Sequence, residues 1–62
     1  MKLMKGKRYL IAYLGIYDYD AYRGYGVYTG MEDLEDAVAL FEFELPDGDR
    51  AWFPLDAVFE VG

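Results

Sequence analysis

The stretch TGMEDLEDAVALFEFEL (residues 29–45) decides whether this chain is mainly β or contains a full helix. Thr29 and Glu32 have the spacing of a capping box, and apolar residues follow at helical intervals. The second part of the stretch instead places an apolar residue at every other position. We therefore predict one short helical turn near residues 31–36 and a strand over about 37–45. The alternative is a helix that continues to the end of the stretch.

The segments on either side of this stretch favour further strands. Tyr9 to Tyr17 is apolar on both alternating faces, which is typical of a central or covered strand. Glycines within residues 25–31 indicate a curved strand. Pro46-Asp47-Gly48-Asp49 predicts a hairpin turn, and residues 54–57 predict a second short turn. The expected strands lie, in chain order, over residues 9–17, 25–31, 37–45, 50–55 and 58–61. Five short strands in 62 residues predict a single domain, residues 1–62, built as a small β-barrel.

The composition excludes most catalytic chemistry. The chain has twelve Asp and Glu, six Lys and Arg, a net charge of −6 and a pI of about 4.2. It contains no Cys, His or Ser, so it has neither the usual nucleophile nor a base that titrates near neutral pH. We expect no enzyme activity, no cofactor and no metal site. The apolar run after residue 8 is too short to span a membrane and lacks a cleavage signal, so we expect a cytoplasmic protein without a membrane partner.

Two motifs resemble those of Src-homology-3 (SH3) domains. Ile16-Tyr17-Asp18-Tyr19 resembles the Ala-Leu-Tyr-Asp-Tyr signature that leads into the first long loop of these domains. Trp52-Phe53-Pro54, followed by Ala57-Val58, resembles the aromatic residue, proline and single helical turn that precede their last strand. The resemblance implies an SH3-like five-stranded barrel. It also implies a groove for proline-rich peptides, lined by Tyr17, Tyr19, Trp52 and Pro54.

The chain departs from the SH3 pattern at two places. It lacks the paired tryptophans of the middle strand, and Ala57 stands where the family usually has a groove tyrosine. The basic start Lys5-Gly6-Lys7 and the Asp-Gly hairpin resemble other barrels of the same superfold, such as the KOW and Tudor types, at least as much. The subfamily therefore stays open.

Tyrosines and carboxylates are the candidate contact residues. We expect Tyr9, Tyr13 and Tyr28 in the core, because a small barrel needs large side chains. A polar, glycine-bearing stretch carries the tyrosines that we expect to form a partner-binding patch: Tyr17, Tyr19, Tyr22 and Tyr25. Four carboxylates in five positions form the densest acidic cluster: Glu32, Asp33, Glu35 and Asp36. This cluster is either a solvated face or a negative surface that imitates a nucleic-acid backbone.

These observations favour a non-enzymatic, acidic protein-binding module. The preferred hypothesis is an inhibitor or adaptor that docks on a partner protein through the tyrosine-rich loop and the carboxylate cluster. In size and charge the chain is similar to small acidic phage proteins that inhibit host DNA-binding enzymes, so an infected host cell is included in the expected cytoplasmic location. Direct binding to duplex nucleic acid is not expected at a net charge of −6.

Two other functions stay open. One is a homo-oligomeric sponge in which Arg23, Tyr22 and Tyr25 hold a small nucleotide-like ligand. The other is a structural subunit of a larger assembly, because the apolar first strand has two faces to cover.

Overall fold

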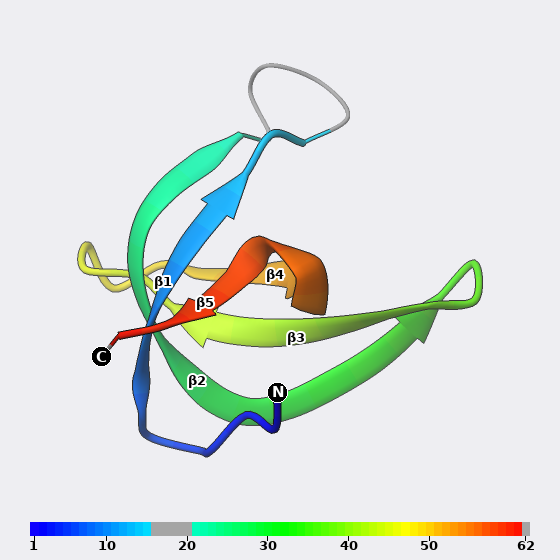
Figure 1. Cartoon of the computed structure of the whole chain (residues 1–62), viewed down its shortest axis with the longest axis horizontal. Coiled ribbons are helices and arrows are strands. Elements are labelled where there is room, and N and C mark those ends of the chain that lie inside the picture. Colours follow the sequence, from blue (N-terminus) through cyan, green and yellow to red (C-terminus); the bar gives the residue numbers. More distant parts are fainter. Residues whose placement is uncertain (16–20, 62) are drawn as a thin grey trace.

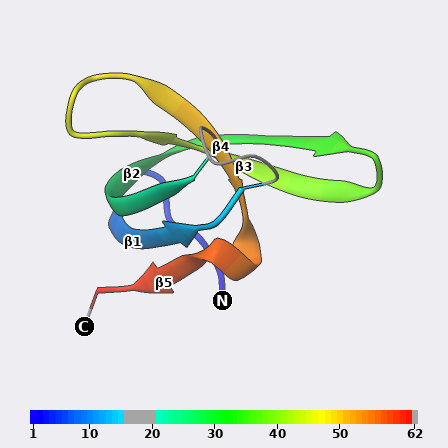
Figure 2. The ribbon, with the colours of Figure 1, turned by 90° about the horizontal axis from the view of Figure 1, so that it is seen from above.

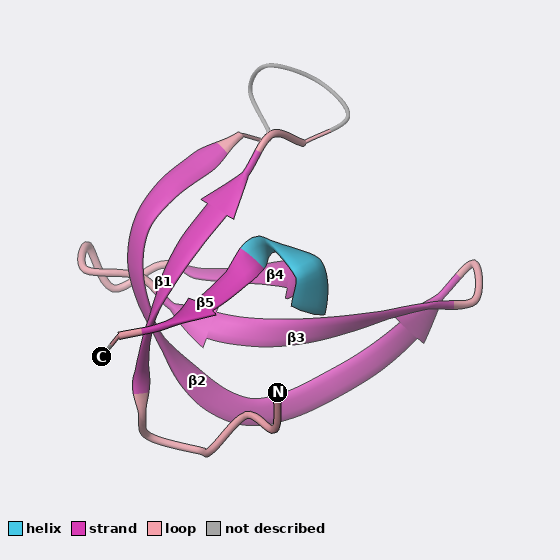
Figure 3. Cartoon of the chain, in the orientation of Figure 1, coloured by secondary structure: helices cyan, strands magenta, loops and turns pink. Residues whose placement is uncertain are grey.

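The chain folds into one antiparallel sheet of five strands. The computed structural model describes residues 1–15 and 21–61. The strands are β1 (Arg8–Tyr13), β2 (Tyr22–Glu35), β3 (Val38–Glu44), β4 (Arg50–Pro54) and β5 (Val58–Glu60). Their order in the sheet is β4-β3-β2-β1-β5, so β5 returns to pair with β1 (Figure 1). A 3-10 turn, η2 (Leu55–Ala57), joins β4 to β5 (Figure 3). The prediction of a mainly β fold with five strands is confirmed.

The predicted helical turn near residues 31–36 is wrong. Strand β2 continues through this segment and pairs with β3 from Glu32 opposite Phe41 to Glu35 opposite Val38. One helical turn fixes several residues for a single hydrogen bond, whereas the strand here gains a full ladder. The longer helix to residue 45 is excluded for the same reason, and the predicted strand over 37–45 is confirmed as β3.

Strand β2 bends sharply at a bulge. Tyr28 lies opposite Phe43 and Glu32 opposite Phe41, so three residues of β2 face one residue of β3. Gly30, inside the bulge, has a φ of 93°, a conformation that glycine adopts without strain. The bend lets the first half of β2 pair with β1 while the second half pairs with β3. Beyond it, the β2–β3 hairpin projects away from the rest of the sheet in both views (Figure 1, Figure 2).

The core lies on the inward face of the bent sheet. Tyr9, Ile11 and Phe43 are completely buried there, and Tyr28 and Phe53 are nearly so. The rings pack mostly edge-to-face or tilted, as for Tyr9 and Phe43 with centroids 6.1 Å apart. The expectation that Tyr9 and Tyr28 belong to the core is confirmed.

The boundaries of β3, β4 and β5 lie within one residue of those expected, whereas β1 and β2 depart by up to four residues from the expected strands over 9–17 and 25–31. The first strand ends at Tyr13, and the second begins at Tyr22. The predicted hairpin turn connects β3 and β4, where the Leu45 amide donates to the Asp49 carbonyl at 2.8 Å. Within residues 1–15 and 21–61 there is no helix long and apolar enough to cross a membrane.

Candidate functional site

Three aromatic rings pack together where the last residue of β1 and the first residue of β2 approach β4. Tyr13 from β1 and Tyr22 from β2 each lie with their ring centroid 5.6 Å from that of Phe53 on β4. The Tyr22 hydroxyl donates a hydrogen bond of 2.7 Å to the Tyr25 carbonyl, which fixes its ring. Burial raises the pKa of Tyr22, and the Asp47 carboxylate raises it further. The phenol therefore stays protonated and neutral well above physiological pH.

A hollow of about 430 Å³ opens beside this aromatic contact. Its lining residues come from β1, β2, β4 and the approaches to them: Tyr13, Ala21, Tyr22, Leu45, Ala51, Trp52 and Phe53. Trp52 keeps 38% of its surface exposed, so a large aromatic side chain is available at the rim. The hollow combines aromatic and aliphatic side chains with polar groups in about equal surface, beside a strand at one end of the sheet order.

A second hollow, of about 390 Å³, lies between the end of β4 and the β2–β3 hairpin. It is lined by Tyr13, Glu35, Asp36, Val38, Leu40 and Pro54. The sheet register explains this set, because Glu35 lies opposite Val38 while Leu40 lies opposite Pro54. Tyr13 borders both hollows, so together they follow β4 along its length. We refer to the two hollows together as the β4 groove.

The structure divides the predicted carboxylate cluster between two faces. Alternation along a strand sends Glu32 to the same face as its neighbour Phe41 and sends Glu35 to the face shared with Val38. Only Glu35 and Asp36 line the β4 groove, whereas Asp33 and Glu32 do not. All four are exposed. The cluster is therefore two small acidic surfaces rather than one continuous patch.

The predicted tyrosine patch is divided as well. Tyr22 lies in the β4 groove, and Tyr25 lies on the opposite face of β2, 44% exposed. The guanidinium of Arg8 covers the Tyr25 ring at 4.6 Å from its centroid, in a cation–π contact. Tyr17 and Tyr19, and the motif that contains them, lie outside the described residues.

The residues of the alternative ligand site are not gathered at one hollow. Tyr22 and Arg23 both line a shallow hollow of about 340 Å³ beside the end of β1. Tyr25 lines a different one, also of about 340 Å³, together with Arg8. A single small ligand held by all three side chains would therefore have to reach both faces of β2.

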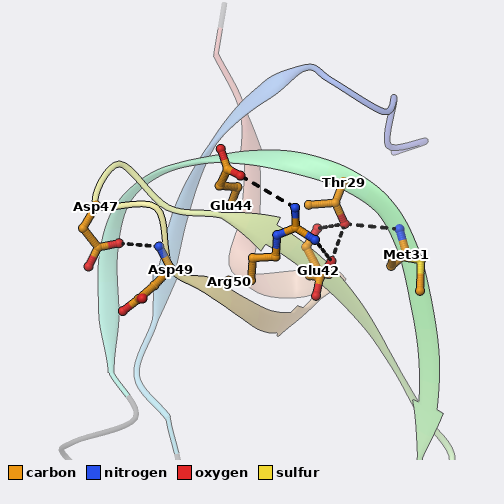
Figure 4. A network of polar contacts seen from close by, with 7 residues as sticks. All are labelled: Thr29, Met31, Glu42, Glu44, Asp47, Asp49 and Arg50. Carbon is orange, nitrogen blue, oxygen red and sulfur yellow. Dashed lines mark hydrogen bonds and ion pairs between the residues drawn. The ribbon is translucent and has the colours of Figure 1, made fainter.

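A polar network supports the bulge that places the hairpin (Figure 4). The Thr29 hydroxyl donates to the Glu42 carboxylate at 2.7 Å and accepts a longer hydrogen bond of 3.4 Å from the Met31 amide. Arg50 on β4 lies with its guanidinium 3.8 Å from the Glu42 carboxylate and 3.9 Å from that of Glu44. These contacts link three strands just outside the β4 groove and hold the sheet in its bent form.

Sequence reasoning missed part of the groove. Leu40 and Val38 were expected only as strand residues, and Tyr13 only as core. Tyr13 is half-buried. It packs on the core against Phe53 and also borders the β4 groove. The alternation from residue 37 onward does place Val38 and Leu40 on one face, and this was the available signal.

Comparison with known proteins assigns no function to this site. No protein-family model, curated protein or solved structure matches the chain. In the part of the chain that the structure describes, no group of three or more Asp and Glu side chains is arranged to hold a metal ion.

Proposed function

We propose that this protein is a non-enzymatic binding module that holds an extended, basic and apolar segment of a partner protein in the β4 groove. The observation that carries the proposal is the make-up of the groove. Exposed Trp52 and half-buried Tyr13, Tyr22 and Pro54 supply apolar walls, and carboxylates stand at the hairpin end. Tryptophan and tyrosine in such a setting are the side chains that most often dominate binding energy.

The charge of the groove favours a cationic partner segment. Glu35 and Asp36 lie beside the apolar surface of Val38, so an Arg or Lys could place its stem on the valine and its charge on a carboxylate. The net charge of −6 would also speed the encounter with a basic partner at low salt.

The arrangement of strands supports the SH3-like barrel as the finer description of the fold. Strand β2 takes part in both halves of the bent sheet, β5 pairs with β1, and a 3-10 turn precedes β5. Trp52 and Pro54 of the matching motif both line the groove. We propose the barrel together with the function, because a shared barrel alone does not define a partner.

The role of inhibitor or adaptor is the form of this function that the small size favours. Imitation of a nucleic-acid backbone receives less support, because the carboxylates of Glu32 and Glu35 lie on opposite faces of the hairpin. In the preferred form, the protein occupies a basic segment of a cytoplasmic partner and blocks or bridges it.

Selection from a phage-displayed library of random dodecapeptides tests the proposal. We expect the wild-type chain to enrich peptides that combine Arg or Lys with Pro or other apolar residues. Synthetic versions of the selected peptides are then titrated by fluorescence anisotropy. Because Trp52 is a rim aromatic, Trp52→Ala should weaken binding by more than about tenfold. Glu35→Lys should also weaken peptide binding, and the loss of affinity should be larger at low salt than at high salt.

Phe59→Ala is the matched control, since Phe59 is an aromatic residue of similar exposure on β5, away from the groove. It should leave peptide affinity unchanged. Enrichment of acidic peptides, or equal losses from Trp52→Ala and Phe59→Ala, would contradict the proposal.

A further inference from the structure

A second apolar surface lies on the outward face of β5, β1 and β2, away from the β4 groove. Leu10 on β1 lies opposite Tyr25 on β2 and opposite Phe59 on β5, so the three side chains form one row across the sheet. They are 38%, 44% and 49% exposed, respectively. Val27 continues the surface one row further along β2, opposite Arg8. We call Leu10, Tyr25, Val27 and Phe59 the outer face. Contiguous apolar surface of this kind marks an interaction site.

The outer face carries two arginines although the chain is acidic. The carboxylate at its edge is Glu44, opposite Val27, and it lies 3.9 Å from the Arg50 guanidinium. Arg8 lies over Tyr25 in the middle of this surface. Arg23 lies two positions before Tyr25, on the same side of β2. Within residues 1–15 and 21–61, neither arginine has a carboxylate within ion-pairing distance. Residues 1–30 hold five of the six basic residues and two of the twelve acidic ones. The charge is thus segregated along the chain.

The complementary surface is on the β2–β3 hairpin of the same protein. Leu34 is 69% exposed, and it shares its face of the hairpin with Glu32 because both lie opposite residues of one β3 face, Ala39 and Phe41. An exposed leucine beside a carboxylate matches an apolar row beside arginines. This face of the hairpin is not part of the β4 groove, whose carboxylates are Glu35 and Asp36.

We propose that the outer face binds the Glu32–Leu34 face of the β2–β3 hairpin of a second copy of this chain. Leu34 packs on the row formed by Leu10, Tyr25 and Phe59, and Glu32 pairs with an arginine at its border. The hairpin tip and the C-terminal end of β5 lie on opposite sides of the molecule in both views (Figure 1, Figure 2), so one copy can offer both surfaces at once. The contact joins two different surfaces, so it either repeats from copy to copy or closes as a symmetric pair in which each hairpin binds the other copy's outer face.

Two other occupants fit the observations less well. Docking of one outer face on another would bring Arg8 and Arg23 against their own copies, and like charges across an interface cost binding energy. Single-stranded nucleic acid could stack on Tyr25 and Phe59, but the net charge of −6 repels a polyanion. The acidic hairpin avoids the first objection. Each copy also carries a net charge of −6, but the contact pairs one local carboxylate with a local arginine and brings no polyanion to the surface.

Two double variants test the proposal by sedimentation velocity on the purified chain alone. The face variant is Arg8→Glu with Leu10→Thr, and the hairpin variant is Glu32→Lys with Leu34→Thr. We expect the wild type to associate as its concentration rises, more weakly as salt is added. Each variant alone should associate at least about tenfold more weakly. An equimolar mixture of the two should form a one-to-one pair, because one intact face then meets one intact hairpin.

The matched control is Glu35→Lys with Val38→Thr, which makes the same kind of change on the opposite face of the same hairpin. It should associate like the wild type while losing peptide affinity in the β4 groove. Self-association therefore fails or succeeds independently of the proposed function. Circular dichroism establishes that each variant is folded.

Several results would overturn the proposal. The first is a wild type that stays monomeric at every concentration. The second is a mixture of the two variants that forms no pair, and the third is a hairpin variant that associates as strongly as the wild type, which would indicate face-to-face contact. The fourth is Arg8-dependent binding of a labelled single-stranded oligonucleotide by a monomeric wild type, which would assign the outer face to nucleic acid.

Discussion

The hydroxyl of Thr29 donates a hydrogen bond of 2.7 Å to the carboxylate of Glu42 across the bulge between β2 and β3. Thr29 belongs to the three residues of β2 that face Glu42 alone. The Glu42 side chain is only 13% exposed and also lies 3.8 Å from the Arg50 guanidinium. This contact fixes the bend in β2, and the bend determines where the hairpin and its side of the β4 groove lie.

Thr29→Val should destabilise the protein by about 1–2 kcal/mol, because it removes a hydrogen bond to a partly buried charged group while keeping the shape of the side chain. Chemical denaturation measures the loss. Thr29→Ser keeps the hydroxyl and should retain most of the stability. Equal losses in the two variants would mean that the methyl group, not the hydrogen bond, supports the bulge.

Ala37→Gly should stabilise the hairpin. Asp36 and Ala37 form the two-residue turn between β2 and β3 with φ values of 50° and 65°, and alanine is strained in this left-handed region. Relief of the strain exceeds the added flexibility of the unfolded chain, for a net gain of about 0.5–1 kcal/mol. Thermal unfolding measures it.

Gly48→Ala, in the turn between β3 and β4, provides the reciprocal control. Gly48 has a φ of 90°, and an added Cβ would meet no atom within 4 Å, so only backbone strain changes. This variant should lose about 1 kcal/mol. A destabilising Ala37→Gly would contradict the left-handed turn.

Gly26→Ala should destabilise the core by about 1–3 kcal/mol through overpacking. A Cβ at Gly26 would lie 2.8 Å from Cδ1 of Ile11 and 3.1 Å from Cβ of Phe43. Ile11→Val removes the closer obstacle. We therefore expect the double variant to lose less stability than the two single variants together, as measured by a double-mutant cycle in denaturant. Simple additivity would show that the clash at Ile11 is absent.

Tyr28→Phe should make the protein more resistant to alkali. Burial raises the pKa of Tyr28 above its ordinary value of 10, and the nearby Glu32 and Tyr9 raise it further. Above pH 10 the folded state keeps a proton that the unfolded state loses. The contribution of Tyr28 to stability is therefore fully present below pH 10 and is lost as the pH rises through the raised pKa.

The phenylalanine variant keeps the ring packed near Phe43 but removes the ionisable group. Denaturant unfolding of both proteins, from neutral pH to above pH 10, measures the difference. We expect a shallower alkaline decline for Tyr28→Phe. Parallel declines would assign the alkaline sensitivity to other groups.

Some elements were predictable because their signals are local. Strand β3 follows from the alternation of apolar residues after position 37, and the turn before β4 follows from Pro46-Asp47-Gly48-Asp49. Tyr9 and Tyr28 were expected in the core because a small sheet needs large side chains. The β2–β3 turn escaped notice because its second residue is alanine rather than glycine, the usual signal for such a turn.

A mainly β chain, with short strands and enough apolar residues for a core, follows from the residue order, because these properties depend on period, turn chemistry and composition. The folded chain was needed to show that Glu32 and Glu35 lie on opposite faces and that Thr29 donates a hydrogen bond to Glu42 rather than capping a helix. It also brought Tyr13 and Pro54 together at one groove. These relationships depend on which strands pair and in which register, and pairing is set by contacts between residues distant in the chain.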